Sequence, residues 1–168
     1  GRPPGRDRAL AGDWVLLTGP VGGSRSGRHL RFSARVSAGS MLHHKFHAAA
    51  LMDVSDGLAW DLFRLARASG VRARLQNVPV HSDSVDASSV DGISPLSHAL
   101  HDGEDHELIA VMRPADAAAA LRSRAKCLEG LSLIGEMEAG SGLVLDQELT
   151  GERSVSWRPS QGGWRHGV

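Results

Sequence analysis

The stretch ALMDVSDGLAWDL (Ala50–Leu62) joins an apolar run to an amphipathic segment, and this join decides the fold. The apolar run over residues 48–54 has the length and composition of a buried strand. After it, Leu58, Leu62, Leu65 and Ala66 recur at i, i+4, i+7 and i+8, which is the spacing of one helix face. The sequence therefore predicts a strand followed directly by a helix that packs on a sheet.

Polar residues mark both ends of this predicted helix, which covers residues 56–69. Ser55 is expected to be its N-cap, and Asp56 and Asp61 lie toward its N-terminus, where the helix dipole favours negative charge. Gly70 stands at the usual position of a C-cap glycine.

Strands and helices are expected to alternate along the rest of the chain. Strands are predicted at residues 13–19 and 71–76, directly after Glu107, and twice within residues 131–146 around a Gly-Ser-Gly turn. Helices are predicted at residues 39–47 and 114–128, whereas residues 77–95 and the tail from 151 are expected to be loops. This interleaving predicts an α/β or α+β fold built in layers.

Length, composition and charge limit the possible functions. The 168 residues suffice for one domain, and 41% hydrophobic with 23% charged residues is the balance of a globular protein. Basic and acidic residues number 19 each, so no overall positive charge attracts nucleic acid or a membrane surface. The single cysteine, Cys127, cannot form an internal disulfide, and no apolar run approaches the length of a membrane span. We expect a cytoplasmic protein without nucleic-acid or membrane partners.

The first residue is glycine rather than methionine. The opening segment GRPPGRDR has no apolar core of the kind that a signal peptide carries. We expect the chain to be a fragment of a longer protein.

A glycine-rich segment, GPVGGSRSGRHL (residues 19–30), follows the first predicted strand. Its backbone amides could approach an anion closely, which would make it a phosphate cradle. It matches neither the Walker A loop nor the dinucleotide fingerprint, and a flexible surface turn is the preferred interpretation.

Asp53, Ser55 and Asp56 could form a ligand site at the carboxyl end of a strand, where open α/β sheets bind ligands. Two carboxylates placed there repel each other unless a cation joins them, and Mg²⁺ prefers such hard oxygen ligands. On this hypothesis the chemistry is phosphoryl transfer by positioning and charge neutralisation. The equally weighted alternative is that Ser55 and Asp56 only cap the helix.

A second acidic cluster, DGEDHEL, contains Asp102, Glu104, Asp105 and Glu107 and precedes an apolar strand. It could be a solvated charged turn, or it could bind a cationic or Mg²⁺-bridged substrate. Periodicity alone leaves both interpretations open.

Together, MDVSDGLAWDL, ALHDGEDHEL, GDWVLLTGPVGGSRSG and GGWRHG resemble the C-terminal half of the thiamine-monophosphate kinases. That family belongs to the superfamily of aminoimidazole ribonucleotide synthetase. The resemblance extends from about Arg6 to His166 and implies a layered α/β/α sandwich with a mixed sheet, forming one domain over residues 1–168. It also implies transfer of the γ-phosphoryl group of ATP to thiamine monophosphate, which gives thiamine diphosphate.

The resemblance also implies roles for individual residues. Mg²⁺ would be held by Asp53 and Asp56, ATP would contact Ser55 and Arg6, and thiamine monophosphate would contact Glu104 and Trp164. These residue types suit the ligands, because carboxylates bind metal ions and an aromatic plane stacks on a cationic heterocycle. None of the six residues is assigned a role as acid, base or nucleophile.

The sequence departs from the family pattern in two motifs and in extent. In the first motif, Gly23 of GGSRSG replaces the acid of the family turn GDSAAG. Asp102 replaces the first glycine of the family motif GGEDYEL, and His106 replaces its tyrosine, so the substrate pocket is expected to be reshaped. The N-terminal half, which in the family supplies much of the ATP site and the dimer interface, is absent. We therefore expect a homodimer at full length and little or no activity of this chain alone. The alternatives are a sister ATP-dependent ligase or cyclase of the superfamily, and a stand-alone binding module without catalysis.

Overall fold

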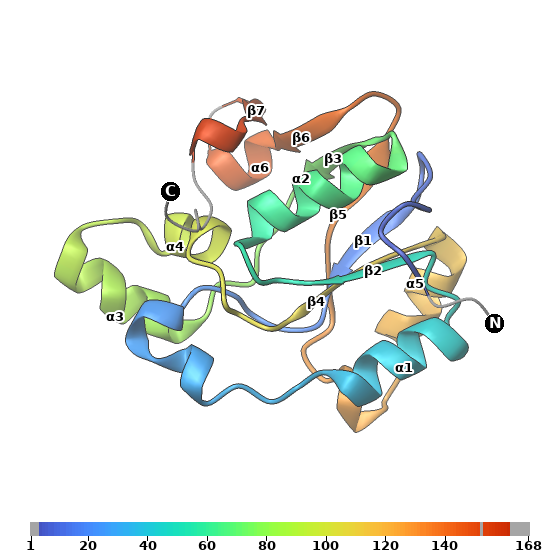
Figure 1. Cartoon of the computed structure of the whole chain (residues 1–168), viewed down its shortest axis with the longest axis horizontal. Coiled ribbons are helices and arrows are strands. Elements are labelled where there is room, and N and C mark those ends of the chain that lie inside the picture. The colour runs from blue at the N-terminus through green and yellow to red at the C-terminus, as the bar shows by residue number, and fades with distance from the viewer. Residues whose placement is uncertain (1–3, 152, 162–168) are drawn as a thin grey trace.

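The computed structural model describes residues 4–151 and 153–161. In this part of the chain one seven-stranded mixed sheet has the order β2-β4-β1-β5-β3-β6-β7 (Figure 1). Its strands are β1 (Trp14–Leu17), β2 (Ala50–Asp53), β3 (Arg72–Leu75), β4 (Leu108–Met112), β5 (Ser132–Glu138), β6 (Gly142–Leu145) and β7 (Val155–Trp157). All neighbouring strands are antiparallel except β3 and β6, which are parallel.

The sheet is covered on both faces. Successive residues of the central strands β1 and β4 therefore face a core in turn, and they are apolar at consecutive positions. Val15 and Leu17 belong to one hydrophobic cluster, whereas Leu16 belongs to a second one on the opposite face. In β4, Ile109 and Ala110 divide between the two clusters in the same way. Continuous apolar runs in the sequence therefore correspond to strands with a core on each side.

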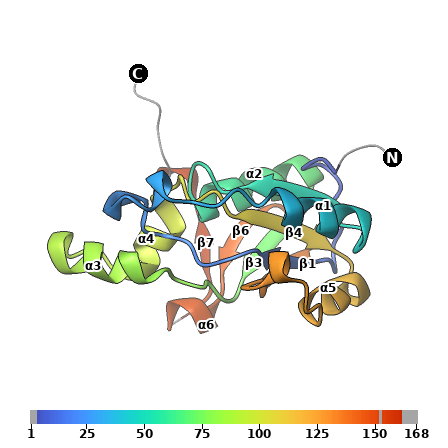
Figure 2. The same cartoon turned by 90° about the horizontal axis from the view of Figure 1, so that it is seen from below.

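Six α-helices lie in the described part of the chain, and four of them, α1, α2, α4 and α5, contribute to the cores on the two faces of the sheet, whereas α3 projects beside it (Figure 2). Helices α2 and α4 contribute to the first cluster, and α1 and α5 contribute to the second. This arrangement confirms the layered α/β/α architecture with a mixed sheet. The bounds are α1 (Val36–His44), α2 (Leu58–Ser69), α3 (Ser82–Asp91), α4 (Pro95–His101), α5 (Pro114–Leu121) and α6 (Gln147–Thr150).

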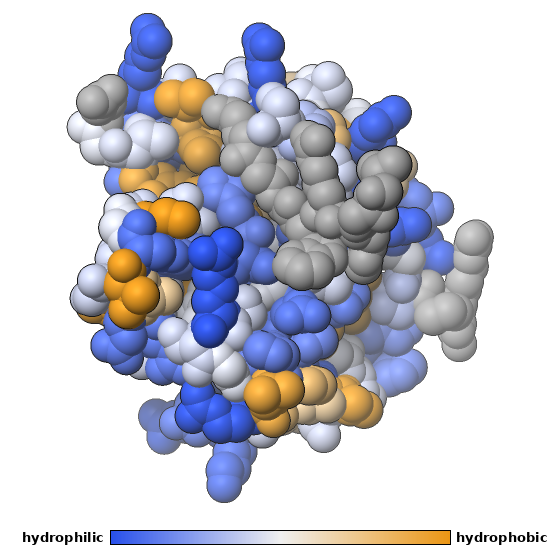
Figure 3. Space-filling model, turned by 60° about the vertical axis from the view of Figure 1, so that its left-hand side comes forward, coloured by the Kyte–Doolittle hydropathy of each residue, from blue (hydrophilic) through white to orange (hydrophobic). Residues whose placement is uncertain are grey.

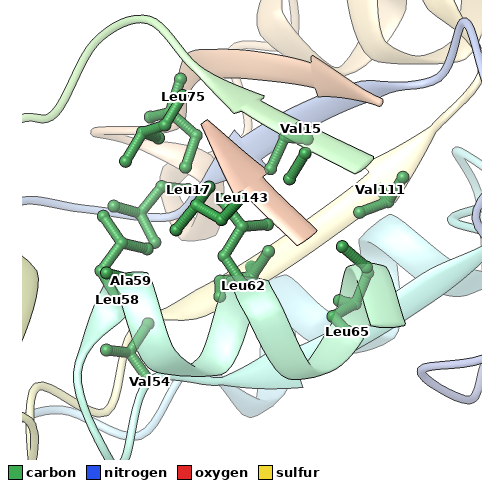
Figure 4. Packing of buried hydrophobic residues seen from close by; sticks show 14 of the residues in the cluster. Val15, Leu17, Val54, Leu58, Ala59, Leu62, Leu65, Leu75, Val111 and Leu143 are labelled. Carbon is green, nitrogen blue, oxygen red and sulfur yellow. The ribbon is translucent and has the colours of Figure 1, made fainter. Parts of the chain in front are cut away.

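Helix α2 packs on the sheet through the predicted stripe. Leu58, Leu62 and Leu65 are fully buried and point toward Val15, Leu17 and other strand residues (Figure 4). Gly70 closes the helix in the left-handed conformation, and its amide bonds to carbonyls of the last turn, as predicted.

The predicted start of α2 is wrong. The helix begins at Leu58, its N-cap is Gly57, and no side chain caps it, so Ser55 is not the N-cap. Residues 54–57 are not helical. The Val54 amide bonds to the Glu107 carbonyl and the Ser55 carbonyl accepts from the Glu104 amide, so this segment pairs with the second acidic motif instead.

The expectation of a loop over residues 77–95 is also wrong, because α3 and the start of α4 lie there. Helix α3 has a weak apolar stripe, and it is held instead by its ends. The His81 ring accepts a hydrogen bond from the Asp83 amide, and Gly92 ends the helix in the left-handed conformation. Helix α4 begins with Ser94 as N-cap and Pro95 in the first turn.

Other boundaries differ by a few residues. Helix α1 starts at Val36 rather than 39, and α5 ends at Leu121 rather than 128, with a 3-10 turn at Lys126–Leu128 that returns Leu128 to the core. The tail contains β7, which pairs with β6 and buries Trp157. No helix of the described residues is long and apolar enough to cross a membrane.

Candidate functional site

The two acidic motifs, which are about fifty residues apart in the sequence, lie side by side. The Glu104 amide donates a hydrogen bond to the Ser55 carbonyl at 2.8 Å, and the His106 amide donates to the Val54 carbonyl at 3.0 Å. The Val54 amide in turn bonds to the Glu107 carbonyl at 2.8 Å. These bonds extend the pairing of β2 with β4 beyond the sheet, so the segments that carry Ser55, Asp56 and Glu104 are adjacent.

The backbone at this junction is held in the left-handed region. Glu104 and His106 have φ angles of 52° and 57°, and Gly103 has a φ angle of 74°. A Cβ at position 103 would lie 2.6 Å from the Ser55 carbonyl oxygen, so only glycine permits this approach. Non-glycine residues with such angles persist where the surrounding structure fixes them, and they cluster at functional sites. The Glu104 side chain is exposed beside the loop that carries Ser55 and Asp56.

Asp61 of α2 holds the loop that carries Ser55 and Asp56 in place. Its buried carboxylate accepts hydrogen bonds from the amides of Ser55 at 2.9 Å and Asp56 at 2.8 Å. Burial raises the pKa of Asp61 to about 6, an effect that these two hydrogen bonds oppose. Asp61 of α2 therefore holds the loop before the helix in place, through the amides of Ser55 and Asp56.

Within the second cluster, Asp105 and Glu107 are buried and bind arginines that follow the glycine-rich loop. Arg28 contacts the carboxylates of Asp105 and Glu107, each at 2.8 Å, and Arg35 binds both oxygens of Glu107 at 2.8 Å. Thr18 donates to Glu107 at 2.6 Å. Burial raises the pKa of Asp105 to about 7, against the lowering effect of Gly22 and Arg28. Asp105 and Glu107 are therefore buried residues with structural partners, and the interpretation of the cluster as a solvated turn is wrong for these two.

Asp102, which departs from the family pattern, has local partners. Its carboxylate lies 2.8 Å from Nδ1 of the buried His98 and 3.4 Å from Nε of Arg25. The other ring nitrogen of His98 lies 3.3 Å from Asp91. The added charge is thus accommodated by a cluster that joins α3, α4 and the glycine-rich loop.

The glycine-rich loop is not the flexible surface turn that was preferred. Residues Val21 to Ser24 are buried, and the Gly22 amide donates to the Asp105 carboxylate at 2.8 Å. That amide is therefore already used by the protein rather than offered to a phosphate.

Asp53 is the last residue of the edge strand β2, and it lines a cavity of about 450 Å³. Among the described residues its carboxylate has no hydrogen-bond or ion-pair partner. Asp56 pairs with Arg64 of α2 on the other side of the sheet. Asp56 is thus paired with Arg64 whereas Asp53 is not paired. Over residues 4–151 and 153–161 no group of three or more metal-binding side chains is assembled.

The two remaining predicted residues lie elsewhere. Arg6 is exposed, and its neighbour Gly5 forms a bridge with Ala50 at the start of β2, the end opposite to Asp53. The structure does not bring Arg6 to Ser55. Trp164 lies outside the described residues.

The donors at the site fit the chemistry of Mg²⁺. Asp53, Asp56 and Ser55 supply hard oxygen atoms, and Mg²⁺ commonly binds one or two carboxylates together with water and substrate phosphates. The exposed ion pair between Asp56 and Arg64 is of the weak kind that can rearrange when a stronger ligand binds.

Comparison with known proteins identifies relatives across most of the chain. A thiamine-monophosphate kinase of Rhodopirellula baltica is 40% identical over 115 residues, covering 67% of this chain and 36% of that protein. A thiamine-monophosphate kinase of Halobacterium salinarum is 33% identical, covering 96% of this chain and 55% of that protein. The solved structure described as AaThiL complexed with AMPPCP and TMP has a TM-score of 0.68 and 27% identity, covering 97% of this chain and 54% of that one.

The chain is homologous to part of the thiamine-monophosphate kinases. The family that the two acidic motifs predicted is thereby confirmed, and with it the fold of the aminoimidazole ribonucleotide synthetase-like proteins. No protein-family model matches the chain. The chain spans about a third to a half of the length of these kinases.

Sequence reasoning missed the arginines that organise the kinase-like site. Arg28 and Arg35 lie more than seventy residues before their partner Glu107. Arg28 lies within the glycine-rich segment and Arg35 follows it, and nothing in that segment indicates buried acidic partners.

Proposed function

We propose that this chain forms the C-terminal half of an ATP-dependent thiamine-monophosphate kinase. The observation that carries the proposal is the junction of the two acidic motifs, in which Glu104 bonds to the backbone of Ser55 within a chain homologous to such kinases. A kinase must hold two phosphorylated substrates against each other, and this junction supplies side chains for both from one loop pair.

Each side chain has a role that matches its surroundings. The unpartnered carboxylate of Asp53 and the half-buried one of Asp56 would hold Mg²⁺, which when bound neutralises phosphate charge. The Ser55 hydroxyl would donate to an ATP phosphate oxygen. Glu104 would orient thiamine monophosphate through its exposed carboxylate, and Asp61 would keep the Ser55–Asp56 backbone in place.

We further propose that the chain acts together with the additional half that its relatives carry, as a homodimer in the cytoplasm, and that it has little activity alone. The partial coverage of the relatives supports this, since the kinases are about twice as long. The contacts that Arg6 and Trp164 would make with ATP and thiamine monophosphate stay predictions.

The test compares the chain alone with the chain joined to the additional half of a relative. Transfer of phosphate from ATP to thiamine monophosphate is expected only in the joined protein. Asp53→Asn should lower its rate about a hundredfold while the melting temperature stays unchanged, because a ligand at a strand end does not contribute to packing. Asp86→Asn, at an exposed position of α3, is the matched control.

Two outcomes would contradict the proposal. Equal loss of rate in Asp53→Asn and Asp86→Asn would remove Asp53 from the site. Binding of nucleotide without binding of thiamine monophosphate by the joined protein would instead indicate a sister activity of the superfamily.

A further inference from the structure

The four acids of the second cluster differ in whether they have partners. Asp105 and Glu107 are buried and bind arginines, and the Asp102 carboxylate contacts His98. Glu104 is exposed, and no hydrogen bond or ion pair joins its carboxylate to another described residue. Of these four acids, Glu104 is therefore the one left for a ligand, and the other three can act on how it is held.

The turn that carries Glu104 needs anchors, because its backbone lies in the left-handed region. Gly103 and Glu104 have φ angles of 74° and 52°, and the Glu104 amide bonds to the Ser55 carbonyl at 2.8 Å. A non-glycine residue keeps such an angle only where its surroundings fix it. On the C-terminal side of the turn the anchor is Asp105, whose buried carboxylate accepts from the Gly22 amide at 2.8 Å.

On the N-terminal side of the turn the anchor is Asp102, which is bound to the interior. Its side chain is 9% exposed, and its carboxylate lies 2.8 Å from Nδ1 of His98, whose side chain is fully buried. The other carboxylate oxygen of Asp102 lies 3.4 Å from Nε of Arg25. The second ring nitrogen of His98 lies 3.3 Å from Asp91 of α3. These contacts fix the end of α4 directly before Gly103.

The two carboxylates that contact His98 belong to different parts of the structure. Helix α3, which carries Asp91, lies on a side of the molecule that is mainly hydrophilic, with apolar residues in separate small patches (Figure 3). Asp102 instead lies between the end of α4 and the turn of Glu104. Loss of the Asp91 carboxylate should therefore loosen α3, whereas loss of the Asp102 carboxylate should loosen the turn.

We propose that Asp102 is a positioning residue, which through His98 holds the turn that presents Glu104 to the cationic ring of thiamine monophosphate. The proposal deepens the proposed function and rests on it only for the identity of the ligand. Because the family motif has glycine at position 102, this anchor belongs to the present chain rather than to the motif.

The first test measures hydrogen exchange of the Glu104 amide by NMR in the 168-residue chain without ligand. Asp102→Ala should speed this exchange about tenfold relative to the amides of β4, because the turn loses its N-terminal anchor. Asp102→Asn keeps an oxygen that can accept from the His98 ring, so its exchange should stay within about twofold of the unmodified chain. His98→Leu removes the partner instead of the carboxylate, and it is a second variant with the same expectation as Asp102→Ala.

The matched control is Asp91→Ala, which removes the other carboxylate that contacts His98. It should speed exchange of the amides of α3 and leave that of the Glu104 amide unchanged relative to β4. A merely structural role of Asp102 would make the two aspartate variants alike.

The second test uses the chain joined to the additional half of a relative. Asp102→Ala should raise KM for thiamine monophosphate about tenfold and leave kcat and KM for ATP within about twofold, because the anchor acts on the binding of one substrate. Asp102→Asn should restore the KM of the unmodified protein.

Three results would overturn the proposal. They are unchanged Glu104 exchange in both Asp102→Ala and His98→Leu, an equal increase in Asp91→Ala, and an unchanged KM for thiamine monophosphate in a joined protein whose Glu104 turn is loosened. If exchange responds as expected while the joined protein transfers no phosphate, the anchor stands and the kinase function fails. If phosphate is transferred but both exchange and KM are insensitive to Asp102, the kinase function stands and this proposal fails.

Discussion

Thr18 shows how a single hydroxyl supports the second acidic motif. It is buried at the end of β1, donates to Glu107 at 2.6 Å and accepts from the Leu108 amide at 2.8 Å. The hydroxyl therefore satisfies one buried carboxylate oxygen and one strand amide at the same time. A buried polar group that loses its partner costs about 1 to 3 kcal/mol.

We expect Thr18→Val to lower the free energy of unfolding by about 2 to 3 kcal/mol, because valine has the shape of threonine but cannot form either bond. Thr18→Ser keeps the hydroxyl and loses one methyl group, so it should cost only about 1 kcal/mol. Urea denaturation of both variants measures the difference. A Val variant as stable as the Ser variant would show that the two bonds contribute nothing.

The residues of the candidate site differ in how far the sequence predicts them. Asp53, Ser55 and Glu104 follow from their motifs, because the type and order of the residues are local signals. Asp105 and Glu107 have the same chemical type as Glu104, yet they are buried. Their burial depends on Arg28 and Arg35, which come from a distant segment, so no local pattern reveals it.

Helix α2 connects the core with the site, since its apolar face fills the first cluster and its Asp61 holds the loop of Ser55. Leu62 is fully buried in the middle of this face (Figure 4). Leu62→Ala should lower the free energy of unfolding by about 2 to 5 kcal/mol through lost burial and a cavity.

The matched control for Leu62→Ala is Arg67→Ala, on the exposed side of the same helix. It should change stability by less than about 0.5 kcal/mol. Thermal and urea unfolding check both variants. Similar losses in the two would mean that the burial of Leu62 does not stabilise the fold beyond what an exposed position of the same helix does.

The helices and strands with periodic apolar residues were predicted from the sequence. Helix α3, which is stabilised mainly by hydrogen bonds at its two ends, was not. β1, β4 and α2 have strong patterns because each buries a face or both faces. Helix α3 has the sequence SDSVDASSVD, whose serines and aspartates favour turns, and it forms because of its capping bonds and its packing on α4. Ser94 and Pro95 before α4 were a capping signal that the polar surroundings obscured.

Across the whole molecule, buried titratable groups make stability depend on pH. The pKa of Asp61 is raised to about 6 in the folded protein and that of Asp105 to about 7, from the ordinary value of 3.8. Each group therefore stabilises the folded state fully below pH 3.8, and this stabilisation is lost as the pH rises through about 6 for Asp61 and about 7 for Asp105. Burial lowers the pKa of His101, whose Nε2 accepts from Trp157. Its contribution has the opposite sign, being present above 6.5 and lost as pH falls.

In the unmodified chain the free energy of unfolding should decline between pH 3.8 and about 7 as Asp105 ionises. In Asp105→Asn this decline should be smaller by roughly 2 to 4 kcal/mol. The slope of stability against pH is the quantity to compare, since the substitution also changes the absolute stability. Urea unfolding at several pH values in this range measures it, with Asp86→Asn as the exposed control. An unchanged slope would show that Asp105 is ionised throughout.

The strand order has a consequence for how the chain reaches this structure. β1 is the first of the seven described strands in chain order, yet its two neighbours in the sheet are β4 and β5, which end at Met112 and Glu138. No hydrogen-bonded partner for β1 therefore exists until most of the chain has been synthesised. Sheets that join such distant segments fold slowly, and the apolar WVLL segment stays exposed meanwhile. While it is being synthesised, this domain should thus depend on chaperones until β4 and β5 are available to pair with β1.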